Sequence, residues 1–356
     1  MKVGIIGLPQ TGKKTLFQVL TGSEVHETGG PAKPIPGTAS IVDQRFDRLV
    51  AMYQPKKETR ARIDLVLMPK MEREAIAKGD IFRDISDVDA LCHVVRAFVD
   101  GSIYHAAGSV DPLRDVEMVN AELLLHDQIF LEKRIERLES GLKKIKDERQ
   151  AKELDLLRRM QAQLEEERPL RLMELGEEEE LLIRSYPLIT RKEMILVFNV
   201  GEDQVGDGAL LDQVRELCAQ GKMEAMSVSA KVEAEIALLE NEEERREFRR
   251  DLGIGQPALE VLALQCLAAL GRISFFTVGK DEVHQWLVRV NSPAPVAAGA
   301  IHTDLQKGFI RAEVMKYDEL ITMGSEAELK KAGKLYVQGK DYIVMDGDIL
   351  NIRFNI

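Results

Sequence analysis

The chain has 356 residues, of which 45% are hydrophobic and 31% are charged. This is the composition of a folded globular protein, and at roughly 100–200 residues per domain the length predicts two or three domains. The net charge of −11 excludes a protein that grips nucleic acid through its whole surface, so any such contact must come from a local patch.

Cysteine usage and hydropathy point to a reduced, cytoplasmic setting. Cys92, Cys218 and Cys266 lie far apart and show neither metal-type spacing nor a disulfide framework. No apolar run approaches the ~18 residues of a membrane span, so we expect no membrane association. The first strand candidate begins at residue 2, and we therefore expect no signal peptide.

The first twenty residues predict a strand, a glycine-rich turn and a helix. Residues 2–6 are apolar and β-branched, and residues 13–21 favour a helix. The residues between the strand and the helix, together with the first helix residue, match the G-x-x-x-x-G-K pattern of a phosphate-binding loop. They are Gly7, Leu8, Pro9, Gln10, Thr11, Gly12 and Lys13. Backbone N–H groups of such a loop, together with the helix start, favour an anion, and Lys13 adds a positive charge.

The residue after the loop lysine departs from the usual pattern. A Ser or Thr at that position normally supplies a hydroxyl to Mg²⁺, but here Lys14 follows and Thr15 comes next. An ammonium group repels Mg²⁺, and Thr15 is turned ~100° further round the helix. Lys14 is predicted either to neutralise phosphate charge or to lie on a solvated helix face.

Other patterns divide the chain into three zones. Further strands are predicted at 63–68, 90–96, 194–199 and 224–229, and residues 23–40 have the Gly and Pro content of a long loop. Residues 116–168 carry an apolar stripe at alternating spacings of 4 and 3, which predicts a helical hairpin with a coiled-coil-like seam. From residue 272, strands at 273–278, 283–290, 309–315, 342–345 and 349–354, with a helix over 294–302, predict a small α+β module.

Several segments together resemble the YchF-type Obg-like ATPases. They are GLPQTGKKTLF (7–17), CHVVRAF (92–98), IYHAAGSVDP (103–112), FNVGE (198–202), VSAKVEAE (228–235), AAGAIHTDLQKGFIRAEV (297–314) and GKDYIVMDGDILNIRFN (339–355). The resemblance implies an α/β fold: a Ras-like P-loop NTPase domain with an inserted coiled-coil hairpin, and a carboxyl-terminal β-grasp module called TGS. The expected bounds are 1–115 with 194–271 for the P-loop domain, 116–193 for the insertion and 272–356 for the TGS module.

The resemblance also implies where the base and the attacking water bind. The family carries N-x-x-E where GTP-binding domains carry Asn-Lys-x-Asp, and it prefers ATP. The base site would then be lined by Asn199, Val200, Glu202, Ser229, Ala230 and Lys231. His105 matches a histidine proposed in the family to assist hydrolysis, although an exposed loop histidine is an equal reading.

Three positions that the family uses around Mg²⁺ are altered here: those of Lys14, Leu67 and a Thr of the first switch loop. Leu67 and Lys70 replace the Asp and the Gly of Asp-x-x-Gly, and Gly30-Pro31-Ala32 stands where a switch loop offers Thr. Asp64 cannot replace the Asp of that motif, because it lies earlier on the predicted strand. Since all three changes act on the same ion, we expect a site that does not hold Mg²⁺ in the conventional way.

The sequence thus predicts a nucleotide-binding regulator with weak or absent hydrolysis. ATP is the expected cofactor, with GTP as the alternative, and any activity would be that of a slow ATPase. The resemblance implies a ribosome or RNA partner for the hairpin and the TGS module, where basic and aromatic residues occur at Lys307, Phe309, Arg311, Lys316, Arg353 and Phe354. The alternative is a non-enzymatic ribosome or RNA interaction protein in which the P-loop domain is mainly structural. The oligomeric state is left open.

Overall fold

A computed structural model describes residues 1–25, 33–72, 76, 79–105 and 107–355. The chain divides into two compact units. The first comprises Met1–Thr38 and Asp64–Leu259, and the second comprises Ala39–Ile63 and Glu260–Ile356.

The first unit is built on a six-stranded sheet whose central strands are parallel. The strand order is β2 (Ile35–Ser40), β4 (Arg62–Leu67), β1 (Lys2–Ile6), β5 (Ala90–Arg96), β6 (Glu193–Asn199) and β7 (Glu224–Val228). The strands are short apolar runs because helices cover both faces of such a sheet. In chain order, the helices of this part are α1 (Lys13–Thr21), α4 (Asp80–Ser86), α8 (Ala209–Gly221), α9 (Ala230–Ala237) and α10 (Glu242–Asp251).

The parallel register brings distant loops to one edge of the sheet. Val3 pairs with Leu65 on one side and Ala90 on the other, and Ala90 pairs with Glu193. The loops that follow β1, β4, β5, β6 and β7 therefore leave from the same, carboxyl edge. In open α/β sheets this is the edge where ligands bind.

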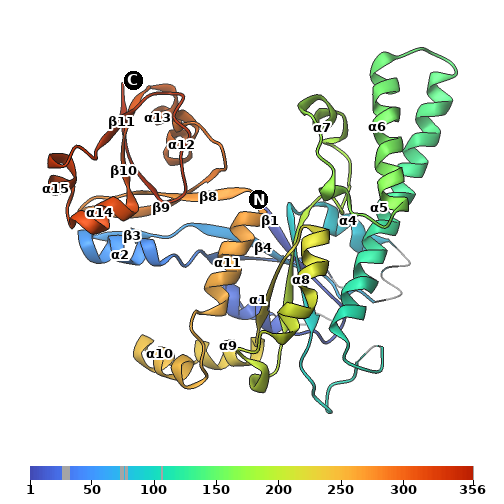
Figure 1. Ribbon diagram of the computed structural model, residues 1–356, viewed down its shortest axis with the longest axis horizontal. Helices are drawn as coiled ribbons and strands as arrows, with labels where there is room; N and C mark the ends of the chain where they lie inside the picture. Colours follow the sequence, from blue (N-terminus) through green and yellow to red (C-terminus); the bar gives the residue numbers. More distant parts are fainter. Residues whose placement is uncertain (26–32, 73–75, 77–78, 106, 356) are drawn as a thin grey trace. The chain divides into compact units, whose positions relative to one another are not determined.

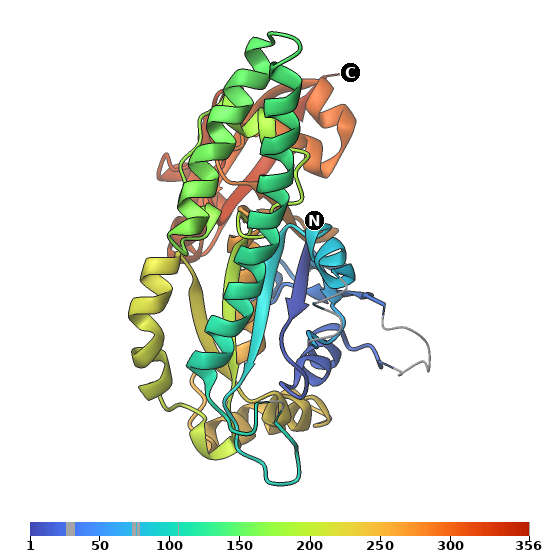
Figure 2. The same ribbon diagram turned by 90° about the vertical axis from the view of Figure 1, so that its right-hand side faces the viewer.

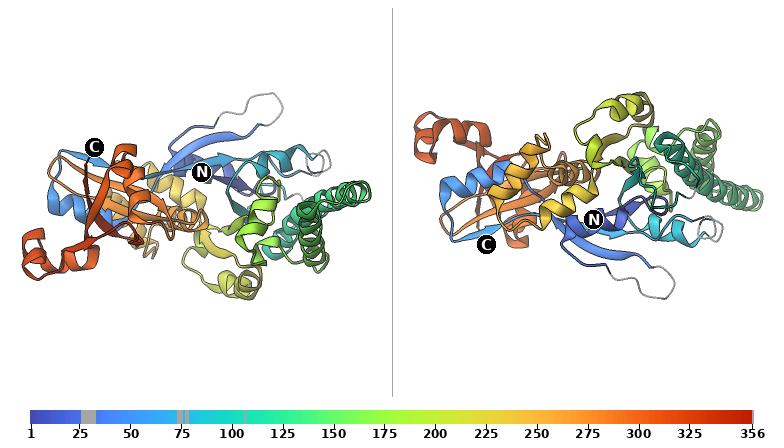
Figure 3. Two further views of the ribbon diagram at one scale, coloured as in Figure 1. Left: turned by 90° about the horizontal axis from the view of Figure 1, so that it is seen from above. Right: turned by 90° about the horizontal axis from the view of Figure 1, so that it is seen from below.

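The predicted helical hairpin is confirmed. Helices α5 (Pro112–Leu142) and α6 (Glu148–Glu165) run side by side in Figures 1, 2 and 3. The apolar stripe forms its own core, in which Leu131, Leu157 and Met160 are fully buried. The 3-10 helix η1 (Leu170–Leu172) and helix α7 (Glu177–Ile183) contribute Leu170 and Ile183 to the same core.

The second unit is an α+β module around another six-stranded sheet. Its order is β11 (Tyr336–Gln338), β10 (Phe309–Lys316), β12 (Asp348–Phe354), β8 (Arg272–Thr277), β9 (Glu282–Arg289) and β3 (Lys57–Thr59). The helices are α2 (Gln44–Tyr53), α11 (Ala258–Ala269), α12 (Ala294–Ile301), α13 (Thr303–Lys307), α14 (Tyr317–Met323) and α15 (Glu326–Lys331). The fold class expected from the sequence is confirmed in both units.

Two local predictions are wrong. Residues 35–40 form strand β2, although their Gly and Pro content predicted a loop. Residues 342–345 are not a strand. Instead, Ile343 makes a single bridge to Pro293, and Val344 N–H donates to the Ser292 carbonyl over 3.0 Å. This segment thus pairs with the residues that precede α12, while β11 and β12 occupy the two sides of β10.

The structure also joins a segment to the second unit that no sequence pattern placed there. Residues 39–63 supply β3, which pairs in parallel with β9, and α2, whose Phe46 and Leu49 are fully buried in the core with Phe276. The three-domain division with its expected bounds stays a prediction.

Candidate phosphate-binding site

The loop after β1 takes a conformation that requires its glycines. Gly7 has φ of +146° and Gly12 has φ of +88°, where L side chains are strained. A Cβ on Gly7 would lie 2.3 Å from the Val94 carbonyl oxygen, and one on Gly12 would lie 2.1 Å from Asn199 Nδ2. The two glycines therefore let the loop turn tightly against β5 and β6. Thr11 is buried and donates its hydroxyl to the Leu8 carbonyl over 3.2 Å.

Lys13 is a buried cation whose hydrogen bonds, within the part of the chain that the structure describes, go to no carboxylate. Its Nζ donates to the carbonyls of Gly7 at 2.5 Å and Leu8 at 2.9 Å, and the residue is only 6% exposed. Burial, and after it the positive charge of Lys70, lower the pKa of Lys13 to about 7, while the charge of Glu72 acts in the opposite direction. A cation held in this way, beside a glycine-rich turn, is suited to an anionic ligand.

Asn199 joins the predicted base-binding segments to the phosphate loop. Its Nδ2 donates to the Thr11 carbonyl over 2.9 Å, and its Oδ1 accepts from the Ala230 N–H over 2.9 Å. Asn199 is 5% exposed, so both bonds are sheltered from water. The side chain therefore fixes three loops to one another. This connecting role comes only from the fold, because 188 residues separate Asn199 from Thr11.

The remaining base-site candidates lie around this link. Glu202 starts the short 3-10 helix η2 (Glu202–Gln204), and its Oε2 lies 3.5 Å from Lys231 Nζ, both side chains being at least half exposed. Exposed pairs of this kind contribute about 0–1 kcal/mol, so both charges can turn to a ligand. Ser229 caps α9, and Val200 is buried in the core of the first unit. The structure thus brings Asn199, Glu202, Ala230 and Lys231 together, while the side chain of Val200 packs in the hydrophobic core.

The donor set at the start of α1 does not fit a conventional Mg²⁺ site. Lys14 and Thr15 are both half-buried in its first turn. Leu67 is a buried apolar residue at the end of β4. Asp64 lies earlier on the same strand, with its Oδ2 3.7 Å from the amino-terminal nitrogen. Within the described ranges, no three His, Cys, Asp or Glu side chains converge as metal ligands. The expected switch position at residues 30–32 lies outside the described residues. The phosphate loop, in contrast, fits an anion.

His105 is held by its own loop. Its Nε2 lies 3.0 Å from Asp115 Oδ2, and its Nδ1 accepts from the Ala107 N–H over 3.1 Å. Arg114 also binds Asp115, over 2.8 Å. Both ring nitrogens are engaged, so a part in hydrolysis, which stays a prediction, would require one of these bonds to open.

Arg96 was missed at the sequence level, and it organises the loop that carries His105. It is 1% exposed, and its guanidinium donates to the carbonyls of Phe98, Asp100, Ile103 and Tyr104. Four backbone acceptors wrapped round one buried cation fix the turn after β5. The signal was available: a charged residue closing the apolar run 90–95 is unusual unless it has such partners.

His93, which lies within the apolar run 90–95, is a core residue rather than a site residue. It lies on β5 beside Ile6, is 1% exposed, and its Nδ1 has no hydrogen-bond partner among the described atoms. Burial, together with the charge of Lys13, lowers its pKa to about 3, so the ring is neutral.

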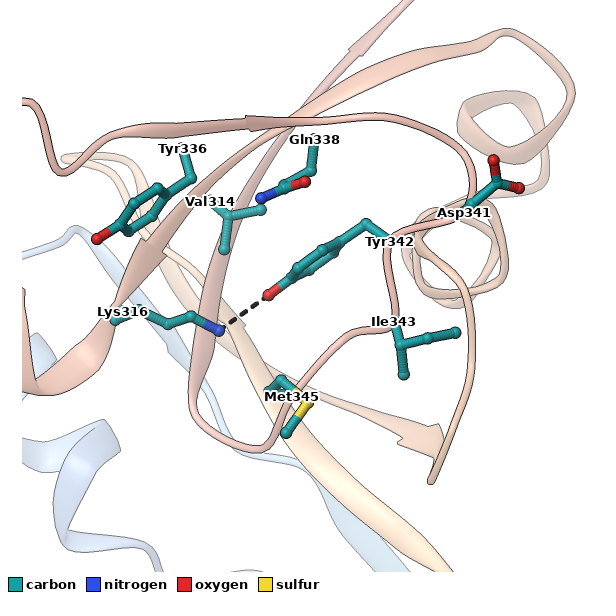
Figure 4. A pocket seen from close by; sticks show the side chains of 8 residues that line it. All are labelled: Val314, Lys316, Tyr336, Gln338, Asp341, Tyr342, Ile343 and Met345. Carbon is teal, nitrogen blue, oxygen red and sulfur yellow. Dashed lines mark hydrogen bonds between the residues drawn. The ribbon is translucent and has the colours of Figure 1, made fainter.

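A cavity with a volume of about 490 Å³ lies in the second unit. Figure 4 shows Lys316 and Tyr342 pointing toward one another, and Lys316 Nζ donates to the tyrosine hydroxyl over 2.9 Å and to buried Asp348 over 2.6 Å. The Lys316 side chain is thus held by bonds within the second unit.

Of the other predicted partner-binding residues, Phe309 is buried, Arg353 pairs with Glu313 over 3.0 Å, and Phe354 is 44% exposed.

Comparisons with known proteins match this chain to one family: a family model matches its carboxyl-terminal part, and curated relatives match its whole length. A family model for the carboxyl-terminal region of YchF GTPases, described as "Protein of unknown function (DUF933)", matches residues 272–355. The "Ribosome-binding ATPase YchF" of Bacillus subtilis (strain 168) is 38% identical over 100% of both chains. The "Obg-like ATPase 1" of Caenorhabditis elegans is 36% identical over 100% of this chain and 92% of its own. The solved structure of the Schizosaccharomyces pombe YchF GTPase superposes with a TM-score of 0.83 at 28% identity, covering 99% of this chain and 97% of that one.

Proposed function

This chain belongs to the YchF family of Obg-like ATPases, and we propose that it is a nucleotide-binding regulator that prefers ATP, hydrolyses it slowly or not at all, and associates with the ribosome. The bond network of Asn199 carries the nucleotide part of the proposal. It assembles the phosphate loop, the Asn199–Glu202 segment and the start of α9 into one site.

The preference for ATP rests on the carboxylate after β6. Glu202 follows the strand where an Asp would accept two N–H groups from guanine, and its side chain is one methylene longer. Adenine offers an acceptor beside an amino group, and the neighbouring Glu202 and Lys231 supply one acceptor and one donor.

Slow hydrolysis follows from the ligands that the site lacks. With Lys14, Leu67 and Lys70 at the positions described above, transition-state stabilisation by a bound metal is lost, which costs several kcal/mol. Binding depends on the loop and on Lys13, and is less affected. Binding of the ribosome is proposed from the names of the relatives, and this chain would offer it the helical hairpin and the second unit.

The deciding experiment is calorimetric titration of the full chain with ATP and GTP, each with Mg²⁺ and with EDTA. ATP should bind more tightly than GTP, and EDTA should weaken ATP binding only modestly. Equal or reversed affinities would contradict the base-site proposal, and a large loss in EDTA would show that Mg²⁺ is needed. Brisk Mg²⁺-dependent phosphate release would contradict slow hydrolysis.

Sedimentation with purified ribosomes tests the partner. The protein should pellet with them, and ATP should change the amount that pellets. Pelleting by a protein that binds neither nucleotide would favour the alternative of a non-enzymatic interaction protein.

A further inference from the structure

Lys70 lies just beyond β4, the strand that runs beside β1 and ends at Leu67. Strand β4 pairs with β1 in parallel, with Leu67 opposite Ile5. The segments that follow β4 and β1 stay hydrogen-bonded beyond the strands. Met68 N–H donates to the Ile5 carbonyl over 3.0 Å, and Met71 N–H donates to the Gly7 carbonyl over 3.4 Å. Lys70 therefore lies alongside the first residue of the phosphate loop, at the carboxyl edge of the sheet.

Lys70 and Lys13 are close enough to repel each other. Lys70 is exposed, while Lys13 is buried, and the charge of Lys70 disfavours the charged form of Lys13. The two ammonium groups repel each other, and no carboxylate among the described residues hydrogen-bonds Lys13. An anion between or beside the two groups relieves the repulsion. The carbonyl oxygens of Gly7 and Leu8, which Lys13 now binds, cannot neutralise its charge.

We propose that Lys70 is a second phosphate-binding cation, which with Lys13 neutralises the outer phosphates of the bound nucleotide where a conventional site uses a metal ion. The proposal rests on the nucleotide-binding function proposed above. It deepens that function, because it names the residue that supplies the missing positive charge. Lys70 has the reach to do this, since a lysine side chain carries its charge on a flexible four-carbon stem.

The test is calorimetric titration of Lys70→Met, Lys70→Arg and wild-type protein with ATP, ADP and AMP in EDTA. Lys70→Met should weaken ATP binding about tenfold, the effect of about 1.4 kcal/mol of lost attraction. It should weaken ADP binding less and AMP binding little, and Lys70→Arg should keep most of the affinity. Lys70 is exposed, so folding is not at risk.

Two further variants sharpen the test. Lys144→Met removes an exposed lysine at the tip of the hairpin and should change nothing, which controls for net charge. Glu72→Gln removes a negative charge that acts on the same site, and at about pH 6, where Lys13 is mostly charged, it should strengthen ATP binding severalfold. A lysine side-chain NMR titration of the ligand-free protein should show the pKa of Lys13 higher in Lys70→Met than in wild type.

The two proposals fail in different ways. Wild-type protein that binds ATP in EDTA with Lys70→Met binding equally well would overturn the role of Lys70 alone. The same holds if Lys70→Met weakens ATP, ADP and AMP by the same factor, because Lys70 would then not act on the outer phosphates. Wild-type protein that binds neither ATP nor GTP would overturn the proposed function, and this inference with it.

Discussion

The residue that most affects the behaviour of the site is Lys13. A buried lysine is costly, and this one is surrounded by Lys70, Glu72 and the neutral ring of His93, with two backbone carbonyls as its acceptors. In the ligand-free protein its pKa is about 7, so near neutral pH it is about half charged. A phosphate favours the charged form, and nucleotide binding is therefore coupled to protonation.

We predict that ATP binding takes up a proton. At about pH 8, free Lys13 is mostly neutral and the bound form is charged, so uptake should approach about one proton per ATP. The affinity should fall as the pH rises above 7, and Lys13 should contribute no pH dependence well below that value. Calorimetry at pH 8 in buffers of different ionisation enthalpy measures the uptake.

Lys13→Arg is the matched control, because a guanidinium stays protonated throughout this range. Whatever affinity this variant retains should carry little proton uptake at pH 8. Binding enthalpies of the wild-type protein that are independent of the buffer would contradict the coupling.

At the scale of elements, the hairpin is anchored by one buried carboxylate. Asp127 of α5 is fully buried and accepts from the backbone N–H of Ile189 at 2.9 Å and of Thr190 at 2.7 Å, and from the Thr190 hydroxyl at 2.7 Å. His126 Nδ1 lies 3.1 Å from Asp127 Oδ1, the oxygen that also accepts from the Ile189 N–H. These bonds fix α5 to the segment that leads into β6, and so connect the hairpin to the sheet that carries the site.

Asp127→Ala should therefore destabilise the protein strongly. Two buried N–H groups would lose their acceptor, and we expect the free energy of unfolding to fall by about 3 kcal/mol, at about 1–3 kcal/mol for each buried unsatisfied group. Urea denaturation followed by circular dichroism measures the change. Asp155→Ala on the exposed face of α6 is the control and should cost less than about 0.5 kcal/mol. Equal stabilities for the two variants would exclude the anchoring role.

At the scale of the whole molecule, the chain does not divide into consecutive domains. Residues 39–63 leave the first unit, add α2 and β3 to the second, and return as β4. The side-chain bonds agree: Arg45 binds Asp346 over 2.7 Å, and Thr59 donates to Glu282 over 2.6 Å. The carboxyl-terminal region is thus completed by a segment from more than 200 positions earlier in the chain.

A fragment of residues 260–356 should consequently fold incompletely by itself. Without Phe46 and Leu49, the buried face of Phe276 and Val283 is exposed, and β9 loses its parallel neighbour. We expect broad NMR spectra for the fragment, and sharp ones after addition of a peptide of residues 39–63. A peptide with Phe46→Ala is the control and should act much more weakly. A well-folded isolated fragment would contradict this account.

The sequence by itself determined the features that depend on neighbouring residues. Local sequence patterns predicted several features that the structure contains. They are the glycines at 7 and 12, the buried strands, the apolar stripe of the hairpin and the position of Lys13. Tertiary structure alone decided what distant residues do to one another. It made Asn199 a link to Thr11, brought the charge of Lys70 to Lys13, and moved residues 39–63 into the second unit. The reason is that such contacts depend on strand order and register. These bring together segments whose local sequences do not indicate which other segment they will contact.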